Sequence, residues 1–379
     1  MVVRRGAVAT CALVACALVT AACSAADTAG QGTPATLSSR SSPAAGSAPR
    51  TSTQSGAQLR QAVIATHLDV PWGLAFLPDG SALVTLRDRA EVVRIGAGGT
   101  TVVGVVPGVQ PNGEGGLLGI ALSPEFAADH QVFLYFTGAD DNRIVRGTFD
   151  GGRLTGIRPI FTGIPKADHH DGGRMAFGPD GLLYAGTGDA GDSEQAQNRS
   201  ALGGKILRLT PEGRPAPGNP FPGSPVWSYG HRNVQGLAWD ASGRMFASEF
   251  GQNTWDELNE IVPGGNYGWP RVEGIANDRR FRNPLVQWST DDASPSGIAI
   301  GPDGAVYMAA LRGETLWRIP LEGNQVGEPQ RLLANAYGRL RTVALAPDGR
   351  LWVVTSNTFR GNPRPDDDRV IAFPVSSLH

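Results

Sequence analysis

The stretch GRMAFGPDGLLYAGTG (Gly173–Gly188) contains the pattern that decides the fold of this chain. A glycine and an alternating apolar run precede Pro-Asp-Gly, and a second alternating run follows it. Asp-Gly supplies the positive φ that a short hairpin turn needs, and the alternation is typical of half-buried strands. The stretch therefore predicts a strand, a tight turn and a second strand.

Five related stretches repeat this unit along the chain, beginning at Gly73, Gly119, Gly236, Gly297 and Val343. The six turns lie about 45 to 62 residues apart, a period that is typical of β-propellers with four strands per blade. We therefore predict an all-β fold, a six-bladed β-propeller of four-stranded antiparallel blades. The ring should close where the early run Ala62–Leu68 or the late run Arg369–Val375 completes a shared blade, because an open ring would leave strand edges unpaired.

The first 22 residues have the pattern of an export signal. Arg4 and Arg5 precede an uncharged apolar run that is too short, and too closely followed by polar residues, to be a membrane span. The sequence TAAC (Thr20–Cys23) resembles a bacterial lipobox, so we predict a lipoprotein-type signal peptide (1–22) and lipidation of Cys23. The protein would then be exported and lipid-anchored to the outer face of the bacterial cell membrane. If the signal is an ordinary secretory one, the protein would be secreted instead.

The remaining chain divides into a tether and one large domain. All three cysteines, Cys11, Cys16 and Cys23, belong to the leader and its processing site, so the folded part can form no disulfide. Residues 23–58 are rich in Ser, Ala, Thr, Gly and Pro and are predicted to be a disordered tether. Residues 59–379 would form the propeller. The net charge of -2 becomes -4 when Arg4 and Arg5 are removed, a balance that gives no indication of nucleic-acid binding.

Polar residues gather around the third repeat. His169, His170 and Arg174 lie at its start, and Asp189 ends its second strand. Since these two strand ends return to the same rim of a hairpin, Asp189 could accept a ring N–H from a histidine and orient it as a base.

The fourth repeat has polar residues at the equivalent position and in the loop that follows it. His231, Arg232 and Asn233 precede it, where arginine could stabilise an oxyanion or hold a carboxylate. The loop after it carries Glu249, Asp256, Glu257 and Glu260. Clustered carboxylates and free loop carbonyls suit calcium above other metals, although an acidic loop is more often simply solvated.

Several motifs together resemble the soluble pyrroloquinoline quinone (PQQ)-dependent sugar dehydrogenases, whose fold is a six-bladed propeller. The resemblance is carried by EGGLLGIALSPEF (Glu114–Phe126), His-Xaa-Xaa-Gly-Arg (His170–Arg174), GHRNVQGL (Gly230–Leu237), GGNYGWP (Gly264–Pro270), ALRGETLWRI (Ala310–Ile319) and GRLRTV (Gly338–Val343). These motifs occur in the order found in the family and extend over nearly everything after the tether.

The resemblance implies roles for individual residues. His170 matches the catalytic base, which takes the proton from the anomeric hydroxyl of the sugar while hydride passes to the quinone, and Asp189 matches the aspartate that supports this base. Arg232 matches a residue near the reactive quinone oxygen. The other implied cofactor contacts are Asn233, Glu114 and the trio Arg312, Arg339 and Arg341, which would hold the quinone carboxylates.

The resemblance also implies calcium. Gly251 and Gln252 match a loop whose main-chain carbonyls hold the catalytic calcium, while Glu257 and Tyr267 match positions linked to a further calcium. Gln252 stands in place of a proline of the best-known member, a change to which a carbonyl ligand is insensitive. Glu114 stands in place of a glutamine and adds negative charge near an anionic cofactor.

The leading hypothesis is a PQQ-dependent oxidoreductase that oxidises an aldose at the anomeric carbon to the lactone. Two electrons would pass through the quinone to an external acceptor that the sequence does not identify. One alternative is a calcium-dependent lactonase or related hydrolase on the same propeller, although a neutral lactone has no evident use for three converging arginines. Another is a non-catalytic propeller that binds sugar or protein.

Overall fold

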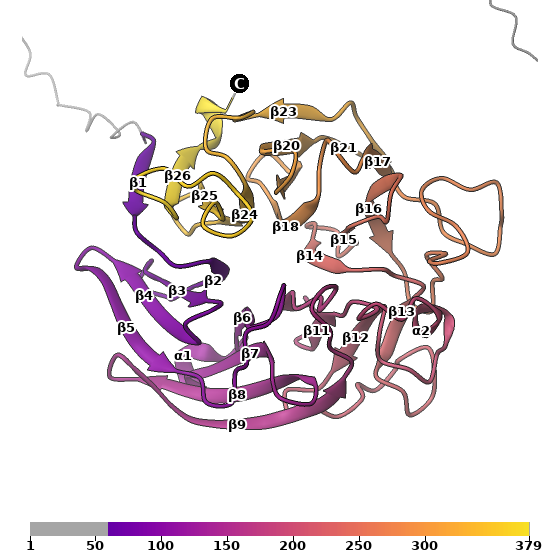
Figure 1. The fold of residues 1–379 in the computed structure, drawn as a ribbon, viewed down its shortest axis with the longest axis horizontal. Helices are drawn as coiled ribbons and strands as arrows, with labels where there is room; N and C mark the ends of the chain where they lie inside the picture. Colours follow the sequence, from indigo (N-terminus) through magenta and orange to yellow (C-terminus); the bar gives the residue numbers. More distant parts are fainter. Residues whose placement is uncertain (1–59, 379) are drawn as a thin grey trace, which may run out of the picture. The chain divides into compact units, whose positions relative to one another are not determined.

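The computed structural model describes residues 60–378, which form six four-stranded antiparallel sheets arranged as blades around a central axis (Figure 1). Helix is confined to the single turns α1 (Phe126–Asp129) and α2 (Glu194–Gln197) and the 3-10 turn η1 (Val375–Ser377) in this part of the chain. The predicted all-β, six-bladed propeller is thus confirmed. Among residues 60–378, none of the helices has the length and apolar character that a membrane-spanning helix requires. The predicted signal peptide, tether and lipidation of Cys23 fall outside the described residues.

In the first five blades the strands follow the order of the chain. Blade 1 contains β2 (Pro71–Phe76), β3 (Ala82–Leu86), β4 (Glu91–Gly96) and β5 (Gly99–Val105). Blade 2 contains β6 (Leu117–Leu122), β7 (Gln131–Thr137), β8 (Asn142–Asp150) and β9 (Arg153–Ile164). Blade 3 contains β10 (Met175–Phe177), β11 (Leu183–Gly186), β12 (Lys205–Leu209) and β13 (Val226–Tyr229). Blade 4 contains β14 (Val234–Trp239), β15 (Met245–Glu249), β16 (Trp255–Ile261) and β17 (Val286–Ser289). Blade 5 contains β18 (Pro295–Ile300), β19 (Val306–Ala310), β20 (Thr315–Ile319) and β23 (Gln330–Leu332), and the small hairpin β21 (Leu321–Glu322) and β22 (Gln325–Val326) precedes β23.

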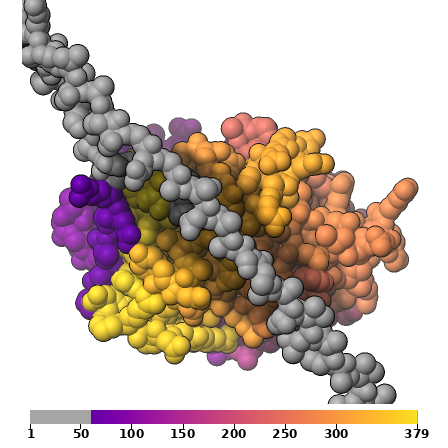
Figure 2. Space-filling model, turned by 90° about the horizontal axis from the view of Figure 1, so that it is seen from above, coloured from indigo at the N-terminus to yellow at the C-terminus, as the bar shows by residue number. Residues whose placement is uncertain are grey.

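The sixth blade joins the two ends of the described chain. It contains β24 (Leu340–Leu345), β25 (Arg350–Thr355), β26 (Val370–Pro374) and β1 (Ala62–Ala65). The pairing of β1 with β26 is antiparallel, with Ala62 opposite Ala372. These two strands accordingly lie side by side in Figure 1, and the indigo and yellow surfaces of the two ends of the described chain adjoin in Figure 2. Both runs singled out in the sequence thus complete the shared blade that closes the ring.

The glycine that begins most repeats lies where neighbouring innermost strands approach each other closely. A Cβ atom on Gly119 of β6 would lie only 2.1 Å from the carbonyl oxygen of Gly173, next to β10. In the sixth repeat Thr342 takes the place of glycine, and its hydroxyl donates a hydrogen bond to the Trp72 carbonyl oxygen of blade 1 (2.7 Å). The glycine of the repeat motif is therefore required by the close packing of the blades around the axis.

Strand direction decides which loops share a face of the propeller. The Pro-Asp-Gly turns join the first strand of a blade to the second, so they lie on one face. The segments that lead into the innermost strands, and the loops between second and third strands, lie on the other face. The polar segments around His170 and Arg232 belong to this second face.

Thr85 of β3 allows a test of the packing between blades 1 and 2. Its buried hydroxyl donates to the Leu118 carbonyl oxygen (2.6 Å) and accepts a hydrogen bond from the Gly73 N–H (2.8 Å). Thr85→Val keeps the shape but leaves both backbone groups unpaired, so we expect the free energy of unfolding to fall by roughly 2–4 kcal/mol. Urea denaturation measures this loss. Thr85→Ser keeps the hydroxyl and is the control; equal losses in the two variants would contradict the role of the hydroxyl.

Candidate active site

A cavity of about 310 Å³ opens on the face where the innermost strands begin, and residues from all six blades line it. Its wall is strongly charged. The charged lining residues are Arg232, Arg312, Arg339, Arg341, Arg360, Glu114 and Asp256. Five arginines against two carboxylates make this cavity cationic in a chain whose net charge is -2.

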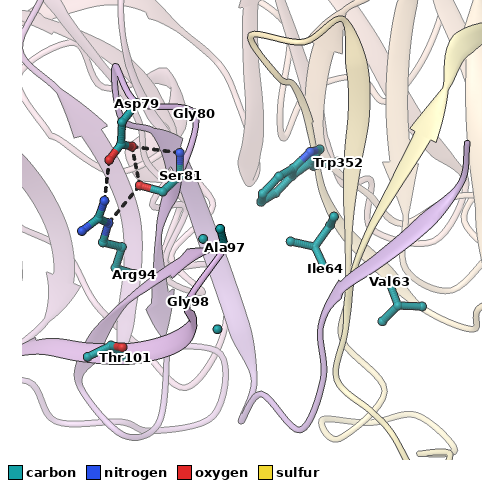
Figure 3. Close-up of a pocket in the computed structure, with 12 residues that line it drawn as sticks. Val63, Ile64, Asp79, Gly80, Ser81, Arg94, Ala97, Gly98, Thr101 and Trp352 are labelled. Carbon is teal, nitrogen blue, oxygen red and sulfur yellow. Dashed lines mark hydrogen bonds and ion pairs between the residues drawn. The ribbon is translucent and has the colours of Figure 1, made fainter. Parts of the chain in front are cut away.

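A larger hollow of about 640 Å³ lies between blade 1 and β1, on the face of the Pro-Asp-Gly turns. Figure 3 shows Asp79, Ser81 and Arg94, which are bonded to one another, on one side of this hollow and Ile64 and Trp352 on the other. Its two charged side chains, Asp79 and Arg94, are paired with each other, so this hollow has no unpaired charge of the kind found in the central cavity.

His170 lines the central cavity and is held by Asp189. The Nδ1 atom of His170 lies 2.7 Å from Oδ1 of Asp189, and the Trp269 indole N–H donates to Oδ2 of the same carboxylate (2.8 Å). Burial raises the pKa of Asp189, but the hydrogen bonds and charge of His170 and the Trp269 bond outweigh it, so the pKa is lowered overall. Asp189 is therefore an anion that fixes one ring nitrogen of His170 and leaves the other for a ligand.

His169 has a different environment from its neighbour. Its side chain is exposed and pairs with Asp168, and its ring meets that of His170 edge to face with centroids 4.3 Å apart. It does not line the cavity.

The side chains of Arg232 and Asn233 lie in different places: Arg232 lines the cavity and Asn233 does not. The Arg232 Nε and Nη2 atoms donate to the Gln252 side-chain oxygen (3.0 and 2.6 Å), at the cavity wall. Burial lowers the pKa of Arg232, although nearby carboxylates oppose this effect. Asn233 lies behind the wall, where its Oδ1 accepts the Gly172 N–H (3.0 Å) and its buried Nδ2 has no partner among the described residues.

All three arginines of the predicted trio line the cavity, but their surroundings differ. Arg339 and Arg341 line the cavity, and the buried Nε atom of each has no hydrogen-bond partner within residues 60–378. Burial lowers the pKa of Arg341 well below its usual range, and Arg339 and Arg87 lower it further. A guanidinium nevertheless keeps its proton in proteins, so these side chains are cations that a bound anion would stabilise. Arg312 is more exposed and pairs with Asp291 (2.6 Å).

The loop of Gly251 and Gln252 is held by a neighbouring carboxylate. One oxygen of Glu273 accepts four consecutive backbone N–H groups, those of Gln252, Asn253, Thr254 and Trp255, at 2.8, 3.2, 2.9 and 2.9 Å. No donor from the described part of the chain bonds to the main-chain carbonyls of Gly251 or Gln252. These carbonyls are therefore available to a cation.

Glu257 and Tyr267 lie behind this loop and do not line the cavity. The Glu257 carboxylate accepts the Gly274 N–H (2.7 Å) and the Asn259 amide (2.9 Å). Burial, followed by the charge of Glu249, raises the pKa of Glu257 to about 8. The Tyr267 hydroxyl is fully used, since it donates to the Glu260 carbonyl (2.7 Å) and accepts the Val262 N–H (2.9 Å).

Several residues of the site were missed in the sequence. Trp269 falls within the GGNYGWP motif, so that motif could have drawn attention to it. Phe359 and Arg360, in the β25–β26 loop, and Glu273 lie in segments without repeat or periodicity. Only the three-dimensional arrangement brings them to the cavity or its supporting loop.

Comparison with known proteins places the chain among sugar dehydrogenases. The family model described as Glucose / Sorbosone dehydrogenase matches residues 68–361. The aldose sugar dehydrogenase YliI of Escherichia coli is 31% identical over 78% of this chain and 90% of its own length. The quinoprotein glucose dehydrogenase B of Acinetobacter calcoaceticus is 33% identical over 63% of this chain and 59% of its own length. The PQQ-bound aldose sugar dehydrogenase of Streptomyces coelicolor is 59% identical, with a TM-score of 0.80 over 82% of this chain and 96% of that structure.

The raised pKa of Glu257 predicts a pH-dependent stability. The folded protein holds a proton on Glu257 up to about pH 8, whereas the unfolded chain releases it near 4.5, so the free energy of unfolding falls as pH rises between these values. We expect Glu257→Gln to remove this part of the decline, on the order of 1–3 kcal/mol, in urea denaturation from pH 5 to 8 in metal-free buffer. Glu322→Gln, at an exposed glutamate, is the control. The same pH dependence in Glu257→Gln as in the unchanged protein would contradict the prediction.

Proposed function

The chain belongs to the glucose/sorbosone dehydrogenase family, and we propose that it is a PQQ-dependent aldose sugar dehydrogenase that oxidises the anomeric carbon to the lactone. The single observation that carries this proposal is the juxtaposition, in one cavity, of a carboxylate-held histidine with two arginines, Arg339 and Arg341, whose buried Nε donors have no partner within residues 60–378. The proposed substrate class and cofactor are supported by the relatives named as aldose sugar dehydrogenase and quinoprotein.

The donor set of the cavity fits pyrroloquinoline quinone. The cofactor is a tricarboxylate, and guanidinium groups bind planar carboxylates with paired hydrogen bonds. Arg339 and Arg341 offer buried Nε–H donors that have no partner in the described part of the chain, and Arg312 adds a more exposed guanidinium to the same lining. When bound, the quinone supplies a two-electron acceptor, and the protein supplies binding, orientation and charge.

The loop carbonyls fit calcium better than a transition metal. Residues 60–378 contain no group of three or more His, Cys, Asp or Glu side chains arranged to hold a metal. Calcium accepts carbonyl oxygens. Its ligands would be the carbonyls of Gly251 and Gln252, to which no donor among residues 60–378 bonds, beside the Asp256 carboxylate on the cavity wall. We propose no direct metal contact for the Tyr267 hydroxyl, because it is already fully bonded.

The proposed chemistry assigns the proton to His170. With Nδ1 tied to the Asp189 anion, the neutral ring presents Nε2 as the acceptor for the proton of the anomeric hydroxyl. The Asp189 charge then stabilises the imidazolium that forms. Arg232 would supply a fixed positive charge at the same wall, which would stabilise the negative charge that a bound quinone gains with the hydride of the sugar.

The site also bears on the alternatives and partners. A hydrolase acting on a neutral lactone leaves Arg339 and Arg341 without a function, so the dehydrogenase is favoured.

We further propose that the electron acceptor is external and that the protein works outside the cell, held at the membrane through lipidated Cys23 or secreted.

His170→Asn tests the base. Both His170 and His67 have positive φ (57° and 56°), a conformation that asparagine tolerates, so His67→Asn is a matched control. With quinone, calcium and aldose present, we expect kcat to fall by roughly 10²–10⁴-fold in His170→Asn and to stay unchanged in His67→Asn. Dye reduction monitors the rate. A His170→Asn protein that retains the activity of the His67→Asn control would overturn the assignment.

Asp189→Asn tests the support of the base separately. An amide N–H in place of the carboxylate favours the wrong ring tautomer, so we expect kcat to fall without loss of quinone binding. Unchanged kcat would contradict the proposed role of Asp189.

A further inference from the structure

The loop between β25 and β26, residues 356–369, forms part of the cavity wall and has no role in the proposed chemistry so far. Phe359 and Arg360, which we call the tip of this loop, line the cavity. The loop reaches across from blade 6 toward the segment that precedes β6 of blade 2.

Two buried carboxylates fix the base of this loop. Asp367 accepts hydrogen bonds from the Asn357 side-chain amide (2.9 Å) and the Arg364 N–H (2.8 Å). The adjacent Asp368 accepts hydrogen bonds from the Thr355 hydroxyl (3.1 Å) and from the backbone N–H groups of Asn357 and Thr358. The ends of the loop are therefore held by hydrogen bonds, although Arg360 is exposed to solvent.

Stacking and an ion pair fix the tip itself. The Phe359 ring lies against the guanidinium groups of Arg87 and Arg360, whose central carbons are 3.8 and 4.9 Å from the ring centroid. Arg360 Nη1 lies 2.8 Å from Oε1 of Glu114. Arg360 is thus held in place even though 55% of its side chain is exposed.

Glu114 connects Arg360 to His170. While Oε1 accepts the Arg360 guanidinium, Oε2 accepts the backbone N–H of His170 (3.1 Å). Burial raises the pKa of Glu114, but the His170 N–H and the charge of Arg360 outweigh it and lower the pKa overall. A charged carboxylate therefore joins the loop to the peptide of the proposed base.

The backbone of His170 needs such support. Its φ of 57° is in the left-handed region, which is unfavourable for a residue with a Cβ and persists only when the surroundings hold it. Glu114 holds the N–H of His170, and the Ala190 N–H holds its carbonyl oxygen (3.2 Å). The direction of the imidazole depends on this peptide as well as on Asp189.

We propose that Arg360 is a positioning residue for His170, acting through Glu114. The ion pair keeps the Glu114 carboxylate turned toward the His170 N–H, and without it that carboxylate is drawn toward Arg339 and Arg341 across the cavity. This inference rests on the proposed function for the role of His170 as the base, but the contacts that it invokes exist without cofactor.

The first test follows hydrogen exchange of the segment 168–174 by mass spectrometry in the purified protein without quinone. Arg360→Gln removes the ion pair, so exchange of this segment should rise several-fold, and Arg360→Lys, which can still pair with Glu114, should restore most of the protection. Arg350→Gln is the matched control, because it breaks an ion pair with Asp348 (2.7 Å) at the other end of β25. Wild-type exchange in Arg360→Gln would overturn the proposal.

The second test is kinetic. With quinone, calcium and aldose, Arg360→Gln should lower kcat on the order of tenfold and leave the KM for the sugar nearly unchanged. Adding Glu114→Gln should lower kcat little further, since both residues act through one contact. Additive losses, or a change confined to KM, would overturn the positioning role. If the unchanged protein shows no quinone-dependent activity, the proposed function fails, while the exchange experiment still decides the role of Arg360.

Discussion

The close approach of the innermost strands around the axis is the constraint on which the rest of the structure depends. Gly119 has no room for a side chain against the Gly173 carbonyl, and Thr342 replaces glycine only by bonding to the next blade. This packing brings the ends of all six innermost strands to one small face. Residues as distant as Glu114 and Arg360, 246 positions apart, therefore meet there.

The second constraint is electrostatic. Arg341 is a buried cation and Arg339 a partly buried one, and the buried Nε donor of each has no partner among the described residues, an arrangement that costs folding free energy unless an anion binds. Asp189 shows the opposite case, because its charge is matched by His170 and Trp269. The cavity thus holds both a carboxylate–histidine pair whose hydrogen bonds are made and arginines whose donors are unpaired within the described residues. We therefore propose that an anionic quinone binds to the arginines, next to the histidine that accepts the proton.

The sequence predicted the parts of the molecule that local pattern controls. Repetition of glycine, alternation and Asp-Gly predicted the blades, and hairpin geometry predicted that His170 and Asp189 share a rim. Local sequence pattern could not predict which side chains face the cavity. Asn233 and Tyr267 lie behind the wall because strand direction and local backbone turn them away, whereas Arg360 and Glu273 act through contacts between loops that carry no periodic signal. Such contacts depend on how blades are placed around the ring.

The decisive measurement is an equilibrium titration of the purified protein with pyrroloquinoline quinone, in the presence and absence of calcium. We expect saturable binding with a Kd in the micromolar range or below, about -8 kcal/mol or stronger, that weakens when calcium is removed. We also expect the bound quinone to be reduced when an aldose is added. Absence of binding at tens of micromolar quinone with calcium present would contradict the proposed function and leave the arginines of the cavity to another anion.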